Sequence, residues 1–335
     1  MDIVPFGPDD AAALAAYVDL RNAVQEADSP WVHPLTVRQA EGHFRHGWDG
    51  EPDTPFLGTE AGVPVAFGTL STSEYDNLHL AWVGCKVHPA HRRRGLGSQM
   101  LEAVVAAGRA RGRTSFGVDA WESETSAAFA ARHGFEPKSV AVNRRQVLTD
   151  IDFGELRARY DEARSFTREY ELVRRAGATP DDELEAVAAL SASINDAPTD
   201  DLDIEDEVFP PERIRAYEVA QQARGYRLYR VLARHRETGE LAGHSVVVVD
   251  GERPELAEQH DTSVVGRHRG HRLGLLLKVD MNLWLRDVEP QIVSIDTWNA
   301  ESNAHMVGVN EQLGYRVMGR EIDYQRGVDR LSTDM

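Results

Sequence analysis

Two short, basic, glycine-containing segments of this 335-residue chain have the composition of a phosphate-binding loop. The first, VHPAHRRRGLGSQML, spans residues 87–101, and the second, VVGRHRGHRLGLLLK, spans residues 264–278. Each lies between an apolar run and a helical pattern, so its backbone N–H groups and the helix N-terminus are directed at one point. This arrangement predicts that each segment binds a diphosphate without a metal ion.

The candidate cofactor-binding residues are those of the two loops and of the strand ends that precede them. Arginines supply positive charge, and glycines let the backbone approach the phosphate oxygens. In the first copy these residues are Cys85, Val87, Arg92, Arg93, Arg94, Gly95, Leu96, Gly97 and Ser98; in the second they are Val264, Arg269, Gly270, His271, Arg272, Leu273 and Gly274. The second loop has Arg272 where the first has Gly95, and we expect Gly270 to compensate for the lost glycine.

The two loops belong to an internal repeat. Gly97 and Gly274 stand at one constant offset of 177 residues, which also relates VDAWESETSA (residues 118–127) to IDTWNAESNA (residues 295–304). Self-similarity at a fixed spacing indicates a duplicated structural unit. The length also favours two domains, because one core rarely organises more than about 250–300 residues.

We predict an N-terminal domain at residues 1–165 and a C-terminal domain at residues 166–335, with the charged segment 153–169 as connector. Both copies follow the order strand, loop, helix, strand, helix. The first copy has expected strands at residues 54–60, 63–71, 78–87 and 114–121 and a helix at 98–111; the second has strands at 226–235, 241–250, 256–265 and 291–298 and a helix at 275–286. The final helices end at Gly134 and Gly314, as glycine C-caps do.

Composition excludes several classes of protein. A net charge of −18 argues against binding to nucleic acid or to an anionic membrane, and it favours cationic partners. The single Cys85 rules out an internal disulfide and a Cys-rich metal site. No apolar run approaches the length of a transmembrane helix, and the N-terminus lacks the pattern of a signal peptide. We therefore expect a cytoplasmic protein without a structural metal.

These motifs resemble those of the GNAT acetyltransferases. The signature of that family is Arg or Gln, two residues, Gly, one residue, and Gly or Ala, with a later helix that ends in Gly-Phe or Gly-Tyr. Residues 92–97 with Gly134-Phe135, and residues 269–274 with Gly314-Tyr315, resemble it. Nearly the whole chain is similar to the tandem actinobacterial type that includes mycothiol synthase.

The resemblance implies an α/β (α+β) fold of two tandem GNAT domains, each a mixed, mostly antiparallel sheet flanked by helices. It implies acetyl-CoA (coenzyme A) as cofactor, bound where the fourth and fifth strands separate. It also implies direct acetyl transfer to a primary amine of a small molecule or peptide, without a metal.

The residues expected to carry the chemistry lie in the second copy. A protonated amine needs a base, and in this family the base is often a carboxylate on the fourth strand. Glu258, His260 and Asp261 lie on that strand, with Glu258 and His260 on one face, and Glu258 is the first choice. A surface role at the start of the strand is the alternative for Glu258. The first copy has no carboxylate there, so we predict catalysis in the C-terminal domain.

The final helix supplies two further candidates. By family position, Asn303 contacts the cofactor and Asn310 stands where the family has a tyrosine that protonates the leaving thiolate. The missing tyrosine leaves two alternatives open: a non-catalytic acyl-CoA-binding sensor or scaffold, and transfer of a longer acyl group. The acidic segment 196–207 is either part of the acceptor site or a solvated surface. The acceptor amine and the oligomeric state stay open.

Overall fold

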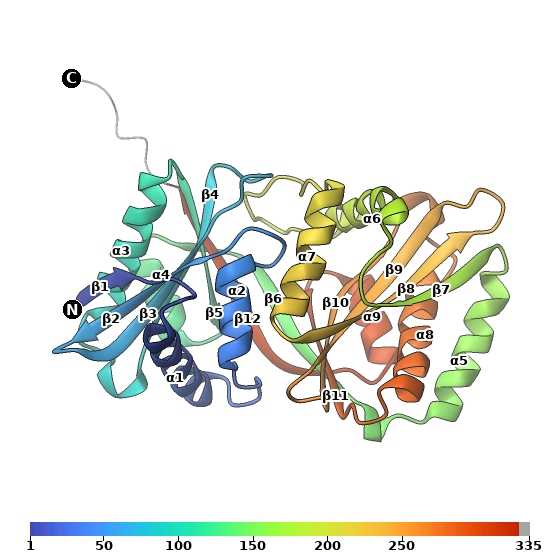
Figure 1. The fold of residues 1–335 in the computed structure, drawn as a ribbon, viewed down its shortest axis with the longest axis horizontal. Helices are drawn as coiled ribbons and strands as arrows, with labels where there is room; N and C mark the ends of the chain where they lie inside the picture. The colour runs from blue at the N-terminus through green and yellow to red at the C-terminus, as the bar shows by residue number, and fades with distance from the viewer. Residues whose placement is uncertain (328–335) are drawn as a thin grey trace. The chain divides into compact units, whose positions relative to one another are not determined.

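The computed structural model describes residues 1–327, and the chain divides into two compact units. The first unit consists of Met1–Val140, Thr199–Asp206 and Gly319–Met335, of which residues 328–335 lie outside the described part. The second unit consists of Ala141–Pro198 and Glu207–Met318. Each unit is a mixed, mostly antiparallel sheet flanked by helices (Figure 1), which confirms the predicted fold class.

The sheet of the first unit has the strand order β1-β2-β3-β4-β5-β12. Its strands are β1 (Asp2–Pro5), β2 (Thr54–Glu60), β3 (Val63–Ser71), β4 (Leu80–Val87), β5 (Ser115–Trp121) and β12 (Arg316–Gly327). Its helices are α1 (Ala11–Asp28), α2 (Val37–His46), α3 (Leu96–Ala110) and α4 (Glu124–Arg132). Among the described strands of this unit, only β4 and β5 pair in parallel, as two strands joined through a helix do.

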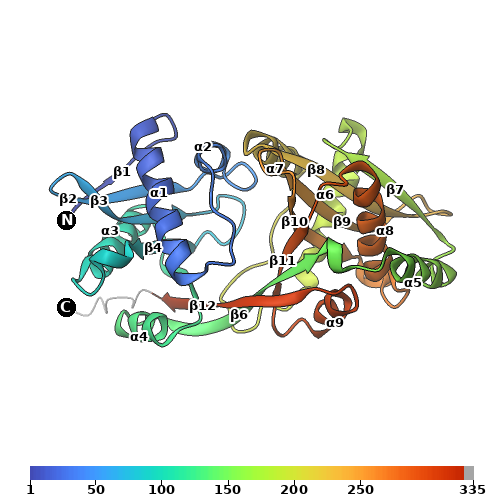
Figure 2. The same cartoon turned by 90° about the horizontal axis from the view of Figure 1, so that it is seen from below.

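Alternate side chains of β3 fill two cores on opposite faces of this sheet. Phe67 packs with Tyr17 of α1, whereas Leu70 packs with Val104 of α3. Successive side chains of a strand point to opposite faces, so helices are needed on both sides to cover them. Figure 2 shows α1 and α3 on the two sides.

The second unit repeats this plan with the order β6-β11-β10-β9-β8-β7. Its strands are β6 (Glu136–Val147), β7 (Tyr170–Ala176), β8 (Tyr226–His235), β9 (Leu241–Asp250), β10 (Leu256–Val264) and β11 (Ser294–Ala300). Its helices are α5 (Phe153–Phe166), α6 (Leu184–Ser191), α7 (Pro211–Ala223), α8 (Leu273–Val288) and α9 (Ala304–Gln312). Again one pair, β10 and β11, is parallel.

The last strand of each repeat completes the sheet of the other unit. β6 follows α4 of the first repeat, yet its residues 141–147 pair with β11 of the second unit. β12 follows α9 of the second repeat, yet its residues 321–327 pair with β5 of the first unit. The division at residue 165 therefore stays a proposal about where one repeat ends, because the compact units follow the exchanged strands instead.

The segment expected to connect the domains is part of the second unit's core. Within it, α5 packs against α8 and contributes the buried side chains of Leu156 and Ala163. The helices after the loops begin at Leu96 and Leu273, two residues earlier than expected. Their first turns therefore lie directly beside the loop glycines.

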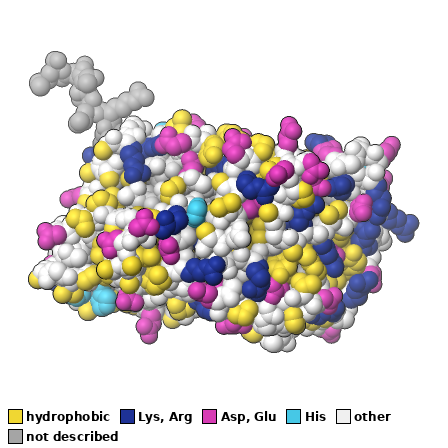
Figure 3. Space-filling view, in the orientation of Figure 1, with side chains coloured by type: hydrophobic (Ala, Val, Ile, Leu, Met, Phe, Trp, Pro, Cys, Tyr) yellow, Lys and Arg dark blue, Asp and Glu magenta, His cyan; other side chains and the backbone are white. Residues whose placement is uncertain are grey.

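None of the helices within residues 1–327 combines the length and apolar character needed to cross a membrane. The space-filling view in Figure 3 shows acidic and basic side chains interspersed over one face.

The strand exchange predicts that the first repeat alone is an incomplete fold. A chain that ends at residue 165 lacks β12 and leaves one edge of β5 unpaired. We expect this fragment to aggregate or to unfold at lower temperature than the full chain, because an unpaired central strand exposes backbone groups and core side chains. A monomeric fragment whose β5 amides exchange hydrogen as slowly as in the full chain would contradict the exchange.

Candidate functional site

A cavity of about 870 Å³ lies entirely within the second unit, where β10 and β11 separate. The parallel pairing of these strands ends at Gln259 and Thr297. Beyond that point both strands continue, and their next residues, including Asp261 and Asn299, line the cavity. The second loop, α8, α9, α5 and the segment 193–198, which includes Asp196, supply the remaining walls. The cavity thus brings together strand ends and a helix N-terminus.

A β-bulge in β10 directs side chains into this cavity. The register with β9 shifts between Gln259 and Thr262, so one extra residue is inserted at His260 and Asp261. A regular strand would place these two side chains on opposite faces, but both line the cavity. Glu258, which alternation places with His260, is not among the lining residues. In the first unit, β3 and β4 pair without any register shift.

Asp261 is held on one side and open on the other. Its Oδ2 lies 2.5 Å from Nε2 of His244, whose side chain is buried. Its Oδ1 is buried and has no hydrogen-bond partner among the described residues. Buried carboxylate oxygens normally accept a hydrogen bond, so this oxygen can still take one. Asp261 can therefore accept a proton or a hydrogen bond from a group inside the cavity.

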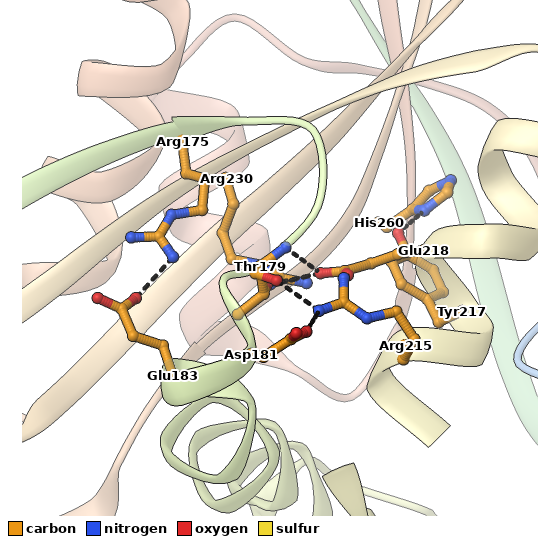
Figure 4. A network of polar contacts seen from close by, with 9 residues as sticks. All are labelled: Arg175, Thr179, Asp181, Glu183, Arg215, Tyr217, Glu218, Arg230 and His260. Atoms are coloured by element: carbon orange, nitrogen blue, oxygen red, sulfur yellow. Dashed lines mark hydrogen bonds and ion pairs between the residues drawn. The ribbon is translucent and has the colours of Figure 1, made fainter. Parts of the chain in front are cut away.

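His260 is positioned from the opposite direction. The hydroxyl of Tyr217 in α7 lies 2.6 Å from Nδ1 of His260 (Figure 4). Burial raises the pKa of Tyr217, so its hydroxyl stays protonated in this contact. Nε2 of His260 lies 3.6 Å from Glu258. The ring is thus fixed between a phenol and a carboxylate.

Glu258 lies outside the cavity lining and forms a surface cluster with its neighbours. Its side chain is 49% exposed, and Oε1 accepts a hydrogen bond from the Tyr226 hydroxyl. Desolvation acts to raise the pKa of Glu258, but His260, Arg224 and Tyr226 stabilise the anion more strongly and lower that pKa to about 2. The geometry therefore favours Asp261 over Glu258 as the base.

A buried polar group lies between α8 and α9. Lys278 is 1% exposed, lines the cavity, and donates a 2.7 Å hydrogen bond from Nζ to Oδ1 of Asn310. The amide of Asn310 in turn donates to Oδ1 of Asn299 at 2.6 Å. Burial lowers the pKa of Lys278 to about 7. Asn310 was among the sequence candidates, but Lys278 was missed.

The repeat itself carried the signal for Lys278. At the offset of 177 residues it stands opposite Leu101, which is buried in the first unit. A lysine that replaces a core leucine in a helix is an anomaly, because lysine is almost never fully buried without a partner.

The two loops share one backbone conformation. Arg93 (φ 65°) and Gly270 (φ 84°) occupy one left-handed position, and Gly95 (φ 80°) and Arg272 (φ 58°) occupy the next. Each loop therefore uses one glycine and one arginine for its two left-handed residues, in opposite order. Left-handed backbone favours glycine, so each loop has one strained residue, Arg93 in the first and Arg272 in the second.

Arg92 and Arg269, which occupy equivalent positions, connect each loop to other parts of its own unit. Arg92 donates to the carbonyl of Val87 and binds both carboxylate oxygens of Asp28 at 2.8 Å. Arg269 donates to the carbonyl of Val264 and binds Asp196 at 2.7 Å. These contacts indicate that both arginines shape the loop.

The remaining sequence candidates of the second copy divide between the cavity and other positions. Asn303 lines the cavity, but its side chain caps α9 by accepting a hydrogen bond from the N–H of Met306. The cavity is also lined by Val264, Arg269, Gly270, Arg272, Leu273 and Gly274. His271 and Asn310 are not among the lining residues. Arg272 is paired with Glu162 of α5.

The corresponding space in the first unit is occupied by side chains. A Cβ added at Gly97 would lie 3.3 Å from the ring of Phe129, whereas one added at Gly274 would meet nothing within 4 Å. The Cys85 thiol donates a hydrogen bond to the Gly97 carbonyl, and the Ser98 hydroxyl is hydrogen-bonded to Nε2 of His133. The other first-copy candidates, Val87, Arg92, Arg93, Arg94, Gly95 and Leu96, lie at this loop. The open loop is thus the second one.

Within residues 1–327, no group of three His, Cys, Asp or Glu side chains is arranged to hold a metal ion.

Comparisons with known proteins agree with this architecture. A family model described as the acetyltransferase (GNAT) family matches residues 18–135. These residues are similar to the GNAT family. Mycothiol acetyltransferase of Stackebrandtia nassauensis is 32% identical over 148 residues, which cover 43% of this chain and 46% of that protein. The match thus spans less than half the length of this curated relative.

Solved structures show the same fold over the whole chain. A tandem GNAT protein from the clavulanic acid biosynthesis pathway, solved without AcCoA, matches with a TM-score of 0.80, 24% identity and 98% coverage of both chains. A GCN5-related N-acetyltransferase from Sphaerobacter thermophilus matches with a TM-score of 0.63 and 18% identity, over 97% of this chain and 96% of that one. The expected resemblance to tandem GNAT proteins is confirmed.

The buried amine predicts that Lys278→Met stabilises the fold at neutral pH. Folding lowers the pKa of Lys278 from 10.5 to about 7, so the burial penalty is complete below pH 7 and fades as the pH rises toward 10.5. At roughly 1.4 kcal/mol per pKa unit, the gain should reach a few kcal/mol at pH 7. Urea unfolding of both proteins at pH 7 and at about pH 9.5 measures it.

The difference between the two proteins should shrink at the higher pH. Lys138→Met, at a surface lysine that pairs with Glu136, is the control and should change little. An equal gain for Lys278→Met at both pH values would show that the amine is not the cause.

Proposed function

We propose that this chain is an acetyl-CoA-dependent N-acetyltransferase that acts on a primary amine of a small molecule or peptide, with the chemistry in the second unit. The observation that carries the proposal is the cavity between the separated ends of β10 and β11, with the second loop at one side and Asp261 at another. This is a binding site whose polar groups converge from several elements.

The second loop fits the diphosphate of coenzyme A. The space beside Gly274 is open, and α8 begins at Leu273, so the free N–H groups of its first turn adjoin that space. Arg269 and Arg272 line the same cavity, and ion pairs with Asp196 and Glu162 balance their charge in this structure. When bound, acetyl-CoA would supply an activated acetyl thioester.

The bulge in β10 provides a place for the thioester carbonyl. The inserted residue at His260–Asp261 leaves the ladder with β9 locally disrupted, so backbone polar groups there are not all used within the sheet. A backbone N–H directed into a cavity can stabilise the negative charge that develops on a carbonyl oxygen during acyl transfer. The first unit has no such bulge.

Asp261 is our proposed base. A lysine-like amine is only about 0.1% neutral at pH 7, so transfer needs a group that removes its proton. Asp261 lines the cavity, its Oδ1 has no hydrogen-bond partner among the described residues, and His244 fixes Oδ2. In this proposal His260, held by Tyr217, shapes the wall beside it. Glu258 stays a competing candidate that the experiment below separates.

The first unit then has a supporting role. Phe129 packs beside Gly97, and apolar Leu101 stands where the second unit has Lys278. The acceptor would enter the cavity of the second unit, and the similarity to a mycothiol acetyltransferase supports a small-molecule acceptor. The cytoplasmic location remains a prediction.

Gly274→Glu should abolish acetyl-CoA binding in the second unit. The site has room for the side chain, so the fold is kept while a carboxylate repels the phosphates. Gly95→Glu places the same charge in the first loop, where Arg272 of the second loop shows that a side chain is accommodated. Calorimetry with acetyl-CoA in the presence of a chelator should show loss of heat for Gly274→Glu only.

Wild-type protein that gives no binding heat under these conditions would refute the proposed cofactor. Full binding by Gly274→Glu together with loss in Gly95→Glu would move the site to the first unit.

Asp261→Asn should reduce turnover by roughly 100- to 10,000-fold with little change in acetyl-CoA affinity, because the amide cannot accept the proton. The difference in turnover between Asp261→Asn and the wild type should become smaller as the pH rises toward the pKa of the acceptor amine, because more of that amine is already neutral. Glu258→Gln is the matched comparison on the same strand and should cost less, because its side chain is half-exposed and outside the cavity lining. Thiol release with a panel of primary amines measures both.

The reverse order of effects would assign the base to Glu258. A wild-type protein that binds acetyl-CoA yet acetylates no amine of the panel would favour the acyl-CoA-binding sensor.

A further inference from the structure

Burial of the lysine in α8 costs free energy, and the fold does not require it. Lys278 is 1% exposed, and its counterpart Leu101 occupies the same helix position in the first unit. Asn310 is likewise fully buried, and by the final glycines of the two helices its counterpart is Ala130, which is buried and apolar. The same architecture therefore forms with two apolar residues. Burying a polar pair instead costs free energy, so a role in the cavity explains the pair better than packing does.

The amine has no compensating charge. Among the described residues Lys278 has no carboxylate partner, and its contacts are the Asn310 oxygen at 2.7 Å and the face of the Tyr315 ring at 4.7 Å. Both contacts suit an ammonium group, because the amide oxygen accepts a hydrogen bond and the ring face attracts a cation. Asn299 fixes the orientation of the Asn310 amide. Nζ is thus held in one place, on a residue that lines the cavity.

Desolvation also sets the direction in which a proton moves. Burial lowers the pKa of Lys278 to about 7, whereas thiols have pKa values near 8.5. Transfer of a proton from this ammonium to a thiolate is therefore downhill. For an ordinary lysine with a pKa near 10.4, the same transfer would be uphill.

We propose that Lys278 is the proton donor to the thiolate that departs during the acetyl transfer proposed above, with Asn310 as the residue that positions it. As the bond between the acetyl carbon and sulfur breaks, the electron pair goes to sulfur, and a proton from Nζ forms the S–H bond. Lys278 is left neutral and regains a proton from solvent. The proton of the acceptor amine leaves separately through Asp261. This inference rests on the proposed function.

Other ionisable groups share the cavity and must be separated from Lys278. Asp261 and His260 face it from β10, Glu162 from α5, Arg272 from the loop and His305 from α9, and the phenol of Tyr315 lies directly against Nζ. Burial raises the pKa of Tyr315, so it stays neutral through the range of interest. The variants below leave all these groups in place, so a difference between variant and wild type reports on Lys278.

The first experiment compares the pH profiles of turnover. In the wild type, kcat should fall as the pH rises above about 7, because the donor loses its proton. Lys278→Met keeps the length of the side chain. It should lower kcat at pH 7 by roughly 100-fold and leave KM for acetyl-CoA within a few-fold. The kcat of this variant should not show the fall at high pH. Lys138→Met, on the surface, should match the wild type.

A second variant should shift the fall of kcat at high pH instead of abolishing it. Asn310→Asp places a carboxylate beside the ammonium, which raises the pKa of Lys278 and should shift this fall to higher pH. A merely structural lysine would not produce this shift.

The third measurement needs no activity. The chain has only three lysines, Lys86, Lys138 and Lys278, so NMR with lysine labelled at Cε resolves each signal. The Lys278 signal, identified by its loss in Lys278→Met, should titrate near pH 7. A midpoint near 10 would overturn the inference, as would wild-type kcat and pH profile in Lys278→Met.

The outcomes separate this inference from the proposed function. Wild-type protein that acetylates no amine refutes the function, and the inference with it. Transfer that persists unchanged in Lys278→Met refutes the inference alone. An acetyl group found on Lys278 by intact mass after incubation with acetyl-CoA would show that the amine acts as a nucleophile, which also overturns the proton-donor role.

Discussion

The separation of β10 from β11 is the constraint on which the site depends. Their parallel pairing ends at Gln259 and Thr297, although both strands continue. Strands that part inside a sheet leave backbone groups without ladder partners, and a buried group without a partner costs about 1–3 kcal/mol. Such a cost persists only where the surrounding structure holds the strands apart. Here α8 and the loop before it border the resulting cavity. The unpaired backbone groups therefore lie where the polar groups of a ligand can form hydrogen bonds with them.

The duplication provides a comparison within one molecule. Both units build corresponding six-stranded sheets, each with a helix after the loop, and the left-handed residues stand at equivalent positions of the two loops. They differ in the space beside Gly97 and Gly274, in the bulge of the fourth strand, and in the residues at positions 101 and 278. Because the fold tolerates either version, none of these polar features is needed for folding. The fold supplies the scaffold, and the function resides in a few side chains placed on it.

The exchanged strands explain why compact units and repeats do not coincide. β6 and β12 each leave the repeat that precedes them and complete the sheet of the other unit. Strand edges with unpaired backbone groups favour pairing with another strand, and here the partner comes from the same chain. The segment after β6 follows it, so α5 packs on α8. Neither unit is therefore formed by one continuous stretch of sequence.

The sequence by itself determined the features that are encoded locally. The period of apolar residues and the glycine positions predicted the strands, the loops and the helices, because local geometry requires those patterns. The constant offset revealed the repeat, and the loop pattern indicated the family.

Tertiary structure alone decided the features that depend on distant segments. Strand alternation placed His260 and Asp261 on opposite faces, because a one-residue bulge is invisible to a period of two. Arg269 looked available for a phosphate until its contact with Asp196, 73 residues away, was seen. Lys278 was not among the sequence candidates, and its burial results from the packing of α8 with α9 and the sheet. Charge and proton affinity are set by burial and by neighbours from distant segments, and a linear sequence does not specify either.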